Sequence, residues 1–329
     1  MVEIKNLGYE NHGRDSLCGL SFCTEDKGAY GILIAREKQR RIFSSLICGC
    51  INASSGEISI NGELMSRNSL ELKKRVRLVP EKLIVDSSST LVEYLDFIGQ
   101  ALNIEPEKRY RQIKEALELV GIDSLQNRLI RYLNDGELCR LAVAGALMGN
   151  PDVLVFDDPF YCLDESTRKE LYSLVEMLSS IKTLFIVSHS VKEIKQLCSR
   201  VLIVSNGKTG IDGKISEIEE KINTTREAYI SVRGEADAII EAIKTVESVV
   251  GAKITSTESN GVHSVRVEHY PDDNIKETLF DALSSINAPM LSIRAITLTL
   301  EDVYFSLTSD ETDDEEAVFE ERKIRTKAF

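Results

Sequence analysis

The stretch Leu133–Asp164, LNDGELCRLAVAGALMGNPDVLVFDDPFYCLD, decides the fold. A helical run over Glu137–Gly149 ends at a Gly-Asn-Pro turn, because glycine and proline stop helices. The apolar run 153–156 follows and ends in Asp157 and Asp158. We therefore expect a buried parallel strand with two carboxylates at its C-terminal edge, where open α/β sheets place their ligand sites.

The order of these parts resembles the ATP-binding cassette (ABC) family. Leu133–Glu137 stands where the family has the signature segment LSGGQ, 153–159 where it has the Walker B strand, and 161–164 where it has the D-loop. The resemblance implies an α/β fold, a P-loop NTPase-like cassette that combines a mixed sheet with a helical subdomain. We place this cassette in residues 1–222.

Composition describes a soluble globular protein. Of 329 residues, 43% are hydrophobic and 28% charged, and the apolar stretch 141–149 is shorter than the roughly 20 residues of a membrane span. No secretory signal opens the sequence, and seven cysteines without a CxxC pair indicate reduced thiols. We expect a cytoplasmic protein whose membrane role comes through a partner. A net charge of −13 argues against nucleic acid as a partner.

A P-loop belongs between the predicted strand 29–34 and the helix that follows it. In the family this loop binds the phosphates of ATP together with Mg²⁺. The matching positions, which we take as the candidate nucleotide-binding residues, are Ile34, Ala35, Arg36, Glu37, Lys38, Gln39, Arg40, Arg41 and Ile42.

The chemistry of these positions departs from that of a P-loop. A P-loop needs glycines for close backbone approach, a lysine for the β- and γ-phosphates, and a hydroxyl for Mg²⁺. Here Ile34, Glu37 and Gln39 hold the glycine positions, Arg40 the lysine position and Arg41 the hydroxyl position. Either the clustered cations bind phosphate in an improvised way, or they form a solvated turn; we favour the solvated turn, and ATP binding is doubtful.

Four further residues match functional positions of the family. Glu81 stands at the Q-loop glutamine and Asp157 at the Walker B aspartate, so both are candidate Mg²⁺ ligands. Asp158 takes the place of the catalytic glutamate and is shorter by one methylene, and His189 matches the switch histidine. Asp158 and His189 are therefore the candidate catalytic residues.

The signature segment is altered as well. In the family a serine and two glycines contact the γ-phosphate bound by the partner cassette. Asn134 replaces the serine, Asp135 replaces the first glycine, and Gly136 and Glu137 follow. Asp135 at a helix start is a good cap but a poor neighbour for phosphate, so we favour the capping role.

The remainder of the chain predicts a second domain. Two amphipathic helices over 91–120 match the helical subdomain that in the family contacts the membrane partner, although such a stripe is more often core. After a linker at Thr224–Thr225, residues 226–308 show a βαββαβ pattern, which predicts a small α+β ferredoxin-like domain. The segment Thr299–Phe305, TLEDVYF, resembles the motif that ends the accessory domain of type-2 exporter cassettes. The charged tail 309–329 is expected to be disordered, with an interaction segment as the weaker alternative.

These expectations combine into one hypothesis. The chain is a nucleotide-binding-domain subunit of an ABC-type exporter, with impaired ATP binding and hydrolysis, docked on a membrane permease at the inner face of the cell membrane. Cassettes of the family dimerise head to tail, with each ATP between one P-loop and the partner's signature, so we expect a second, different cassette in a heterodimer. The alternatives are an active ATPase subunit and, less favoured, a soluble scaffold cassette.

Overall fold

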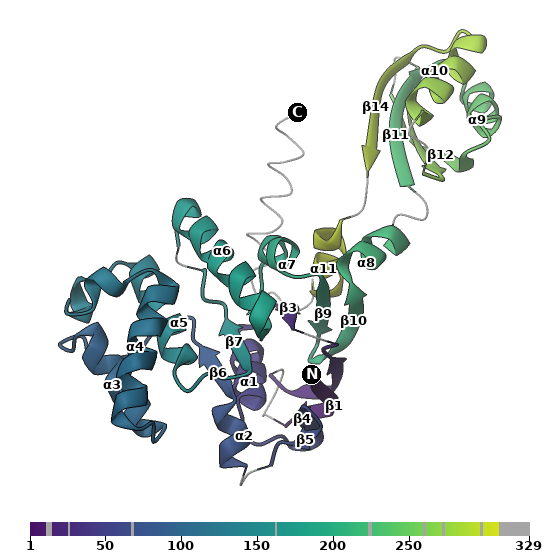
Figure 1. Cartoon of the computed structure of the whole chain (residues 1–329). Coiled ribbons are helices and arrows are strands. Elements are labelled where there is room, and N and C mark those ends of the chain that lie inside the picture. Colours follow the sequence, from purple (N-terminus) through teal and green to yellow (C-terminus); the bar gives the residue numbers. More distant parts are fainter. Residues whose placement is uncertain are drawn as a thin grey trace. The chain divides into compact units, whose positions relative to one another are not determined.

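The computed structural model describes residues 1–10, 15–25, 27–66, 69–161, 163–222, 226–258, 261–271, 274–296 and 299–308 (Figure 1). The chain forms two compact units. The first runs from Met1 to Lys214 and also holds Tyr304–Thr308, and the second is Ile215–Val303. The predicted linker Thr224–Thr225, the tail 309–329 and Cys162 lie outside the described residues.

A six-stranded sheet forms the centre of the first unit, in the order β10-β9-β3-β8-β7-β6. Its strands are β3 (Gly28–Ile34), β6 (Val76–Val79), β7 (Val153–Asp157), β8 (Thr183–Ser188), β9 (Arg200–Ser205) and β10 (Lys208–Lys214). All neighbours are parallel except β9 and β10, which form an antiparallel hairpin. The mixed sheet that the sequence predicts is therefore present.

The inner strands are apolar runs because both of their faces are covered. Every residue of β7 and β8 is buried. Helix α1 (Glu37–Ile47) packs on one face, where Phe43 joins the core formed with Ile32. Helices α6 (Glu165–Ile181) and α7 (Val191–Leu197) also pack on the sheet. A Cβ at Gly31 would lie 2.4 Å from Cγ2 of Ile194, so α7 approaches the face opposite to α1.

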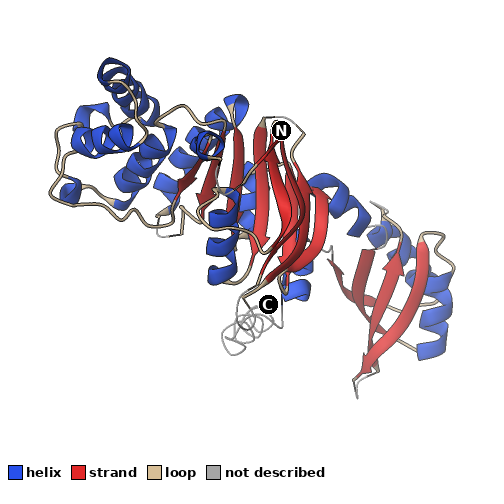
Figure 2. Ribbon diagram, turned by 90° about the horizontal axis from the view of Figure 1, so that it is seen from below, coloured by secondary structure: helices blue, strands red, loops and turns tan. Residues whose placement is uncertain are grey.

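An antiparallel sheet, in the order β2-β1-β4-β5, completes the core of this unit (Figure 2). Its strands are β1 (Val2–Tyr9), β2 (Leu17–Cys23), β4 (Ser55–Ile60) and β5 (Glu63–Leu64). Apolar side chains of β1, β2 and β4 pack with those of α1 and the central sheet in one hydrophobic cluster. This cluster fixes the position of α1, the helix that follows the predicted P-loop.

The remaining helices of the first unit form a layer beside β6 and β7 (Figure 1). They are α2 (Leu70–Lys74), α3 (Leu91–Ala101), α4 (Pro106–Val120) and α5 (Asp135–Leu147), with short 3₁₀ turns at Asp123–Leu125 and Ile130–Tyr132. Close packing among α3, α4 and α5 buries the apolar stripe of α4 and partly buries that of α3. No helix within the described ranges is long and apolar enough to cross a membrane.

The second unit carries a four-stranded antiparallel sheet in the order β12-β13-β11-β14. Its elements are α8 (Ile215–Ile222), β11 (Arg226–Arg233), α9 (Ala236–Lys244), β12 (Val249–Thr257), β13 (Val262–His269), α10 (Ile275–Ser285) and β14 (Met290–Ile296). From β11 to β14 the order is βαββαβ with the first and third strands in the centre, which is the ferredoxin-like arrangement. Apolar residues of α9 and α10 pack with one face of this sheet.

Helix α11 (Leu300–Thr308) follows the second unit and ends in the first. The Thr299 hydroxyl accepts from the Asp302 amide at 3.3 Å, and the Asp302 carboxylate accepts from the Thr299 amide at 2.9 Å. This capping box starts the helix at the motif that the sequence singles out. Within the first unit, Ser205 Oγ donates to the Leu307 carbonyl at 2.6 Å.

Candidate functional site

The candidate site lies at the C-terminal edge of the central sheet. Strands β3, β8 and β7 are adjacent and parallel, so the residues that follow them meet at one edge. The loop after β3 carries the P-loop positions, β7 ends in Asp157 with Asp158 after it, and His189 follows β8. The structure thus brings together three groups of residues that are far apart in the sequence.

A buried ion pair occupies the centre of this site. Arg40 Nη2 lies 3.1 Å from Asp158 Oδ2, and only 8% and 2% of the two side chains are exposed. Arg40 Nη1 donates to the carbonyls of Ala35 at 3.0 Å and Ile34 at 3.3 Å. The guanidinium therefore connects the loop after β3 to the carboxylate after β7. The solvated-turn interpretation is wrong for Arg40, since its charge is buried and paired.

Asp158 is held from several directions. His189 Nδ1 lies 2.7 Å from Asp158 Oδ2, the same oxygen that faces Arg40. Ser188 Oγ lies 3.0 Å from Asp158 Oδ1 and 2.9 Å from Glu193 Oε2. The backbone of Asp158 has φ +49°, a left-handed conformation that aspartate adopts more readily than most residues. Both carboxylate oxygens are thus engaged by groups of the chain itself.

Asp157 lies beside this ion pair and is buried. Burial raises its pKa to about 6, and the nearby carboxylates of Asp158 and Glu81 act in the same direction. The Ser44 hydroxyl and the charge of Arg40 lower this pKa without offsetting the burial. Burial therefore disfavours the charged form of the Asp157 carboxylate relative to its form in water.

The other candidate metal ligand is engaged by a cation. Arg41 Nη2 lies 2.7 Å from Glu37 Oε1 and 3.4 Å from Glu81 Oε2. These side chains are partly or largely exposed, so the bridge contributes little to stability. It nevertheless places a guanidinium, which can only donate, where the family has a hydroxyl that ligates the metal.

The other P-loop positions serve the packing of the loop and α1. Ile34 is fully buried in the core, and Ile42 packs against it. Gln39 is also fully buried and donates from Nε2 to the Ser16 carbonyl at 3.3 Å. Lys38 is exposed and pairs with Asp15 at 3.4 Å. Ala35 and Arg36 are partly buried, with Arg36 preceding α1 as an N-cap that makes no side-chain cap bond.

The residues present do not fit a Mg·ATP cradle. Arg40 fills the loop with its own guanidinium, and Arg41 faces Glu81. In the part of the chain that the structure describes, no three His, Cys, Asp or Glu side chains form a group that could hold a metal ion. No chemical step through bound ATP is derived from this geometry.

The signature segment forms a helix start whose cap differs from the prediction. Asn134, not Asp135, is the N-cap of α5: its Oδ1 accepts from the Glu137 amide at 2.8 Å. Glu137 Oε2 accepts from the Asn134 amide at 2.9 Å and completes a capping box. Asp135 is the first helical residue and is exposed. The prediction erred because asparagine and aspartate cap helices equally well, so residue type alone does not choose between neighbours.

Gly136 has a packing role that the sequence does not show. A Cβ at this position would lie 2.4 Å from Cγ2 of Thr167 on α6. The glycine therefore lets α5 approach the start of α6. Packing alone therefore requires a glycine at this position.

Sequence reasoning missed Ser188 and Glu193, the second pair of groups around Asp158. Both are buried, and burial raises the pKa of Glu193. The position of Ser188 directly before His189 at a strand end was the signal available for it. Glu193 lies in the first turn of α7 and gave no signal beyond its charge.

Comparison with known proteins identifies relatives of this chain. Residues 42–161 match the family model described as ABC transporter. This part of the chain thus resembles the ATP-binding cassette domain of ABC transporters. It is 27% identical to an uncharacterized ABC transporter ATP-binding protein of Synechocystis sp. over 89% of this chain and 78% of that one. It is 21% identical to the linearmycin resistance ATP-binding protein LnrL of Bacillus subtilis over 94% of this chain and 98% of that one.

A solved structure supports the fold of the cassette. The structure of cbiO1 from Clostridium perfringens, described as part of the ABC transporter complex cbiONQ, superimposes with a TM-score of 0.58 at 21% identity. It covers 68% of this chain and 94% of that one. The predicted fold class, a P-loop NTPase-like ABC cassette with a mixed sheet, is confirmed.

Proposed function

We propose that this chain is the nucleotide-binding-domain subunit of an ABC-type membrane exporter, and that its own nucleotide site has impaired ATP binding and hydrolysis. It works at the inner face of the cell membrane, docked on a permease subunit. A second cassette of different sequence supplies the competent nucleotide site of the pair.

The observation that carries the proposal is the buried Arg40–Asp158 ion pair. ATP hydrolysis requires cations and hydrogen-bond donors aimed at the transferred phosphate, and an acidic group that positions water. Here the cation at the P-loop lysine position is committed to the acidic residue and to loop carbonyls. In this arrangement neither Arg40 nor Asp158 is available to contact phosphate or to position water.

Two observations support export over import. The alignment with LnrL, a linearmycin resistance ATP-binding protein, includes nearly the whole of both chains. The TLEDVYF segment forms α11 with its capping box, at the position where the resemblance to type-2 exporters places it.

The heteromeric pair follows from the arrangement of nucleotide sites that the family resemblance implies. In a homodimer, both sites would combine Glu37 and Arg41 of one chain with Asn134 and Asp135 of the other. Neither site would then hold the groups that stabilise charge in phosphoryl transfer. A partner with an intact P-loop and catalytic glutamate would restore one site, and closure at that site could drive transport.

Turnover of the assembled transporter tests this proposal. The complex is purified with its native permease and second cassette, and ATP hydrolysis is measured. Asp158→Asn in this chain should leave the rate per assembled complex nearly unchanged, even though it destabilises the cassette, whereas removal of the catalytic glutamate of the second cassette should abolish the rate. The active-ATPase alternative predicts the reverse, and a transporter with two copies of this chain that hydrolyses ATP would refute the proposal.

A further inference from the structure

The sheet of the second unit has two faces of different character. Helices α9 and α10 pack against the face to which Ala228, Ile230 and Val265 point. Side chains alternate across a strand, so the neighbours of these residues on β11 and β13 point to the opposite face. On that face Tyr229 is partly buried and Arg266 is exposed. We call it the open face.

Cations form a row across the open face. The register of the sheet aligns one residue from each strand: Lys253 on β12, Arg266 on β13, Tyr229 on β11 and Arg294 on β14. Adjacent strands are roughly 4.8 Å apart, so the row is about 14 Å long. Three cations and one aromatic ring therefore lie on a line at right angles to the strands.

The rows on either side differ in chemistry. On one side each strand contributes a serine, and these face one another in register: Ser256, Ser264, Ser231 and Ser292. Their hydroxyls can donate to a carboxylate and bring no charge that would neutralise the cations. On the other side Glu227 and Glu268 lie opposite each other. The open face thus places its cations between a neutral and an acidic row.

Two of the three cations are available to an external acceptor. Arg266 Nη2 pairs with Glu227 Oε1, and the Tyr229 hydroxyl donates to Glu227 Oε2 at 3.3 Å. Lys253 and Arg294 are exposed and make no hydrogen bond or ion pair with the residues that the structure describes. The two ends of the row can therefore take carboxylates without breaking an existing ion pair.

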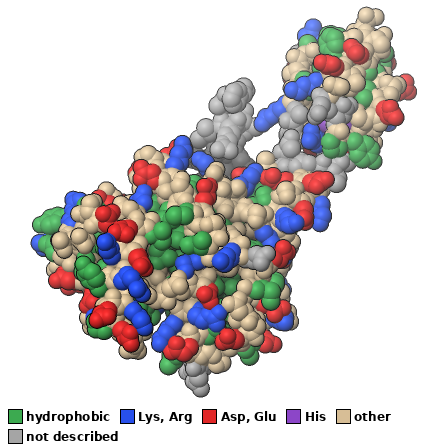
Figure 3. Space-filling model, viewed as in Figure 1, with side chains coloured by type: hydrophobic (Ala, Val, Ile, Leu, Met, Phe, Trp, Pro, Cys, Tyr) green, Lys and Arg blue, Asp and Glu red, His purple; other side chains and the backbone are tan. Residues whose placement is uncertain are grey.

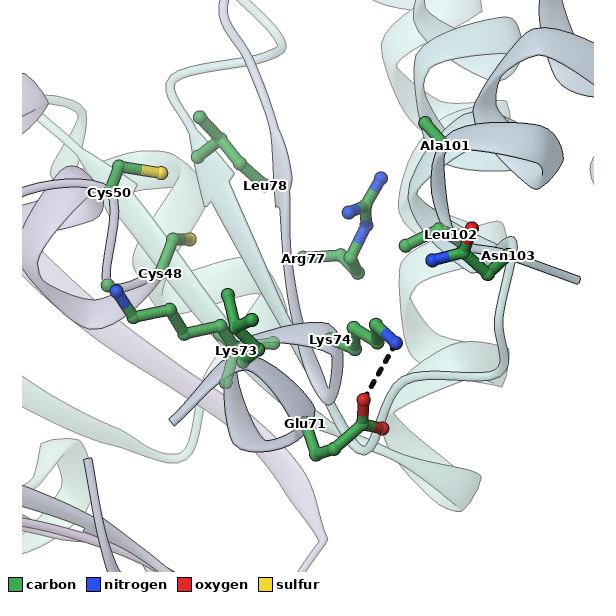
Figure 4. Close-up of a pocket in the computed structure, with 13 residues that line it drawn as sticks. Cys48, Cys50, Glu71, Lys73, Lys74, Arg77, Leu78, Ala101, Leu102 and Asn103 are labelled. Carbon is green, nitrogen blue, oxygen red and sulfur yellow. Dashed lines mark hydrogen bonds and ion pairs between the residues drawn. The ribbon is translucent and has the colours of Figure 1, made fainter. Parts of the chain in front are cut away.

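A row of like charges contrasts with the rest of the protein. The chain has a net charge of −13, and charges of both signs are interspersed over the face of the first unit seen in Figure 3. A cavity of about 680 Å³ in the first unit also gathers cations, namely Lys73, Lys74 and Arg77 (Figure 4). There Lys74 engages Glu71 at 2.8 Å, and Lys73 extends in another direction, toward Cys48 and Cys50. That cavity is the competing site against which the row must be tested.

The chain itself contains a segment of opposite charge. Of the twelve residues from Asp310 to Glu321, eight are aspartate or glutamate. Glu311, Asp313 and Glu315 stand at alternate positions. In an extended segment three such carboxylates span about 14 Å, which is the length of the row.

Covalent attachment favours this segment over a free acidic peptide. Each exposed ion pair is weak, so a free peptide held by a few of them binds poorly. A segment of the same chain is present at a high effective concentration, which makes weak contacts sufficient.

We propose that the acidic segment 310–321 of this chain docks across the cationic row of the open face, with carboxylates on Lys253 and Arg294. Exposed ion pairs hold it, so docking is reversible and weakens as ionic strength rises. The docked segment keeps other acidic molecules off the open face. Neither the row nor the segment contains a candidate nucleotide residue, so the proposal is independent of the proposed function.

Fluorescence anisotropy with a labelled peptide of sequence 309–321 tests the proposal. The control peptide has asparagine and glutamine in place of aspartate and glutamate. The two proteins are the full chain and a chain that ends at Thr308, which keeps α11. The shortened chain should bind the acidic peptide at least several-fold more tightly than the full chain, whose row is already occupied. The control peptide should bind neither protein.

A full-length chain with neutral residues at the acidic positions of 310–321 should bind the peptide as the shortened chain does. This second variant retains the length of the tail and separates the effect of charge from that of truncation. The difference between the natural and the shortened chain should persist on dilution, because the effective concentration of an attached segment does not change.

Variants of the shortened chain locate the docking site. Lys253→Gln and Arg294→Gln should each weaken peptide binding about threefold, and the double variant about tenfold, as expected for exposed ion pairs. Lys276→Gln removes the same charge from an exposed position on α10, the helix that packs on the opposite face, and is the matched control. Lys73→Gln and Arg77→Gln test the cavity of Figure 4. These three variants should leave the affinity unchanged.

Four results would overturn the proposal. They are equal binding of the acidic and control peptides, equal affinity of the full and shortened chains, a difference between these chains that disappears on dilution, and a loss of affinity in the Lys276 or cavity variants as large as that in the double variant. Circular dichroism of each protein separates lost binding from lost folding.

Discussion

Arg40 Nη2 lies 3.1 Å from Asp158 Oδ2 in a site from which solvent is almost excluded. The two residues stand at the P-loop lysine position and at the catalytic glutamate position of the cassette. In this chain they face each other, and the loop that would hold phosphate holds a side chain of its own. The proposed function takes this ion pair as structural, which has testable consequences for stability as well as for nucleotide binding.

Removal of one partner of this ion pair should destabilise the cassette strongly. Arg40→Met leaves Asp158 buried without its cation, for which we expect a loss of about 3–5 kcal/mol in the free energy of unfolding. The double variant Arg40→Met, Asp158→Asn should lose clearly less than the sum of the single losses, because the two residues are coupled. Urea denaturation of the four proteins measures this, with exposed Arg41→Met as a control expected to lose at most about 1 kcal/mol. Additive losses would show that the two side chains act independently.

The pH dependence of stability should reflect Asp157. Its pKa is about 6 in the folded protein, against an ordinary value of 3.8 for an exposed aspartate, so the folded state binds the proton more tightly. Stability contributed by this proton is present below pH 3.8 and is lost as pH rises to about 6. Asp157→Asn should remove this loss. Between pH 4 and pH 7 the free energy of unfolding of the variant should therefore increase relative to that of the wild type by on the order of 2 kcal/mol.

Thermal unfolding of both proteins across this pH range checks the prediction for Asp157. Asp123→Asn removes a charge of the same kind from an exposed position and is the matched control. A constant difference between the Asp157 variant and wild type at all pH values would contradict the raised pKa.

The assignment of Asn134 as the N-cap of α5 can be tested by substituting Asn134 and its neighbour Asp135 separately. Asn134→Ala removes the side chain that accepts from the Glu137 amide, and should lower stability by about 1 kcal/mol. Asp135→Ala, at an exposed first-turn position, should cost less. Chemical denaturation of both variants decides the assignment, and a larger effect at Asp135 would restore the original expectation from the sequence.

Packing at Gly136 can be tested by substitution and rescue. Gly136→Ala should destabilise the cassette by roughly 1–3 kcal/mol, because its Cβ would overlap Cγ2 of Thr167. Thr167→Ser removes that methyl and keeps the hydroxyl that donates to Asp164 at 2.6 Å. The double variant should recover much of the lost stability. Failure to recover would mean that Gly136 is required for its backbone and not for this contact.

The sequence predicts the main helices and strands of this protein, because their signals are local. The helix before Asn150 and the apolar strand before Asp157 are predicted from the spacing of apolar residues and from turn residues, which depend only on local sequence. The structure contains both, as α5 and β7. The family resemblance adds the order of motifs, which places the P-loop positions and His189 at one edge of the sheet.

The contacts within the site could not be predicted in the same way. The pairing of Arg40 with Asp158 joins residues 118 positions apart and depends on the depth of the loop after β3, which no local pattern encodes. The charges of Lys38, Arg40 and Arg41 predict a solvated turn from sequence, and only burial in the structure distinguishes Arg40 from Lys38 and Arg41. The choice of Asn134 as the cap likewise depends on backbone geometry.

Isothermal titration calorimetry of the full chain with Mg·ATP tests the central claim most directly. The account predicts no measurable Mg-dependent binding up to millimolar ATP in the wild-type protein. The variant Glu37→Gly, Gln39→Gly, Arg40→Lys, Arg41→Thr restores two of the three glycines, the lysine and the hydroxyl of a P-loop and removes the guanidinium from Asp158. It should gain binding if circular dichroism shows that it folds. Micromolar Mg-dependent binding by the wild-type chain would contradict the account, because it would mean that the Arg40–Asp158 pair opens readily for nucleotide.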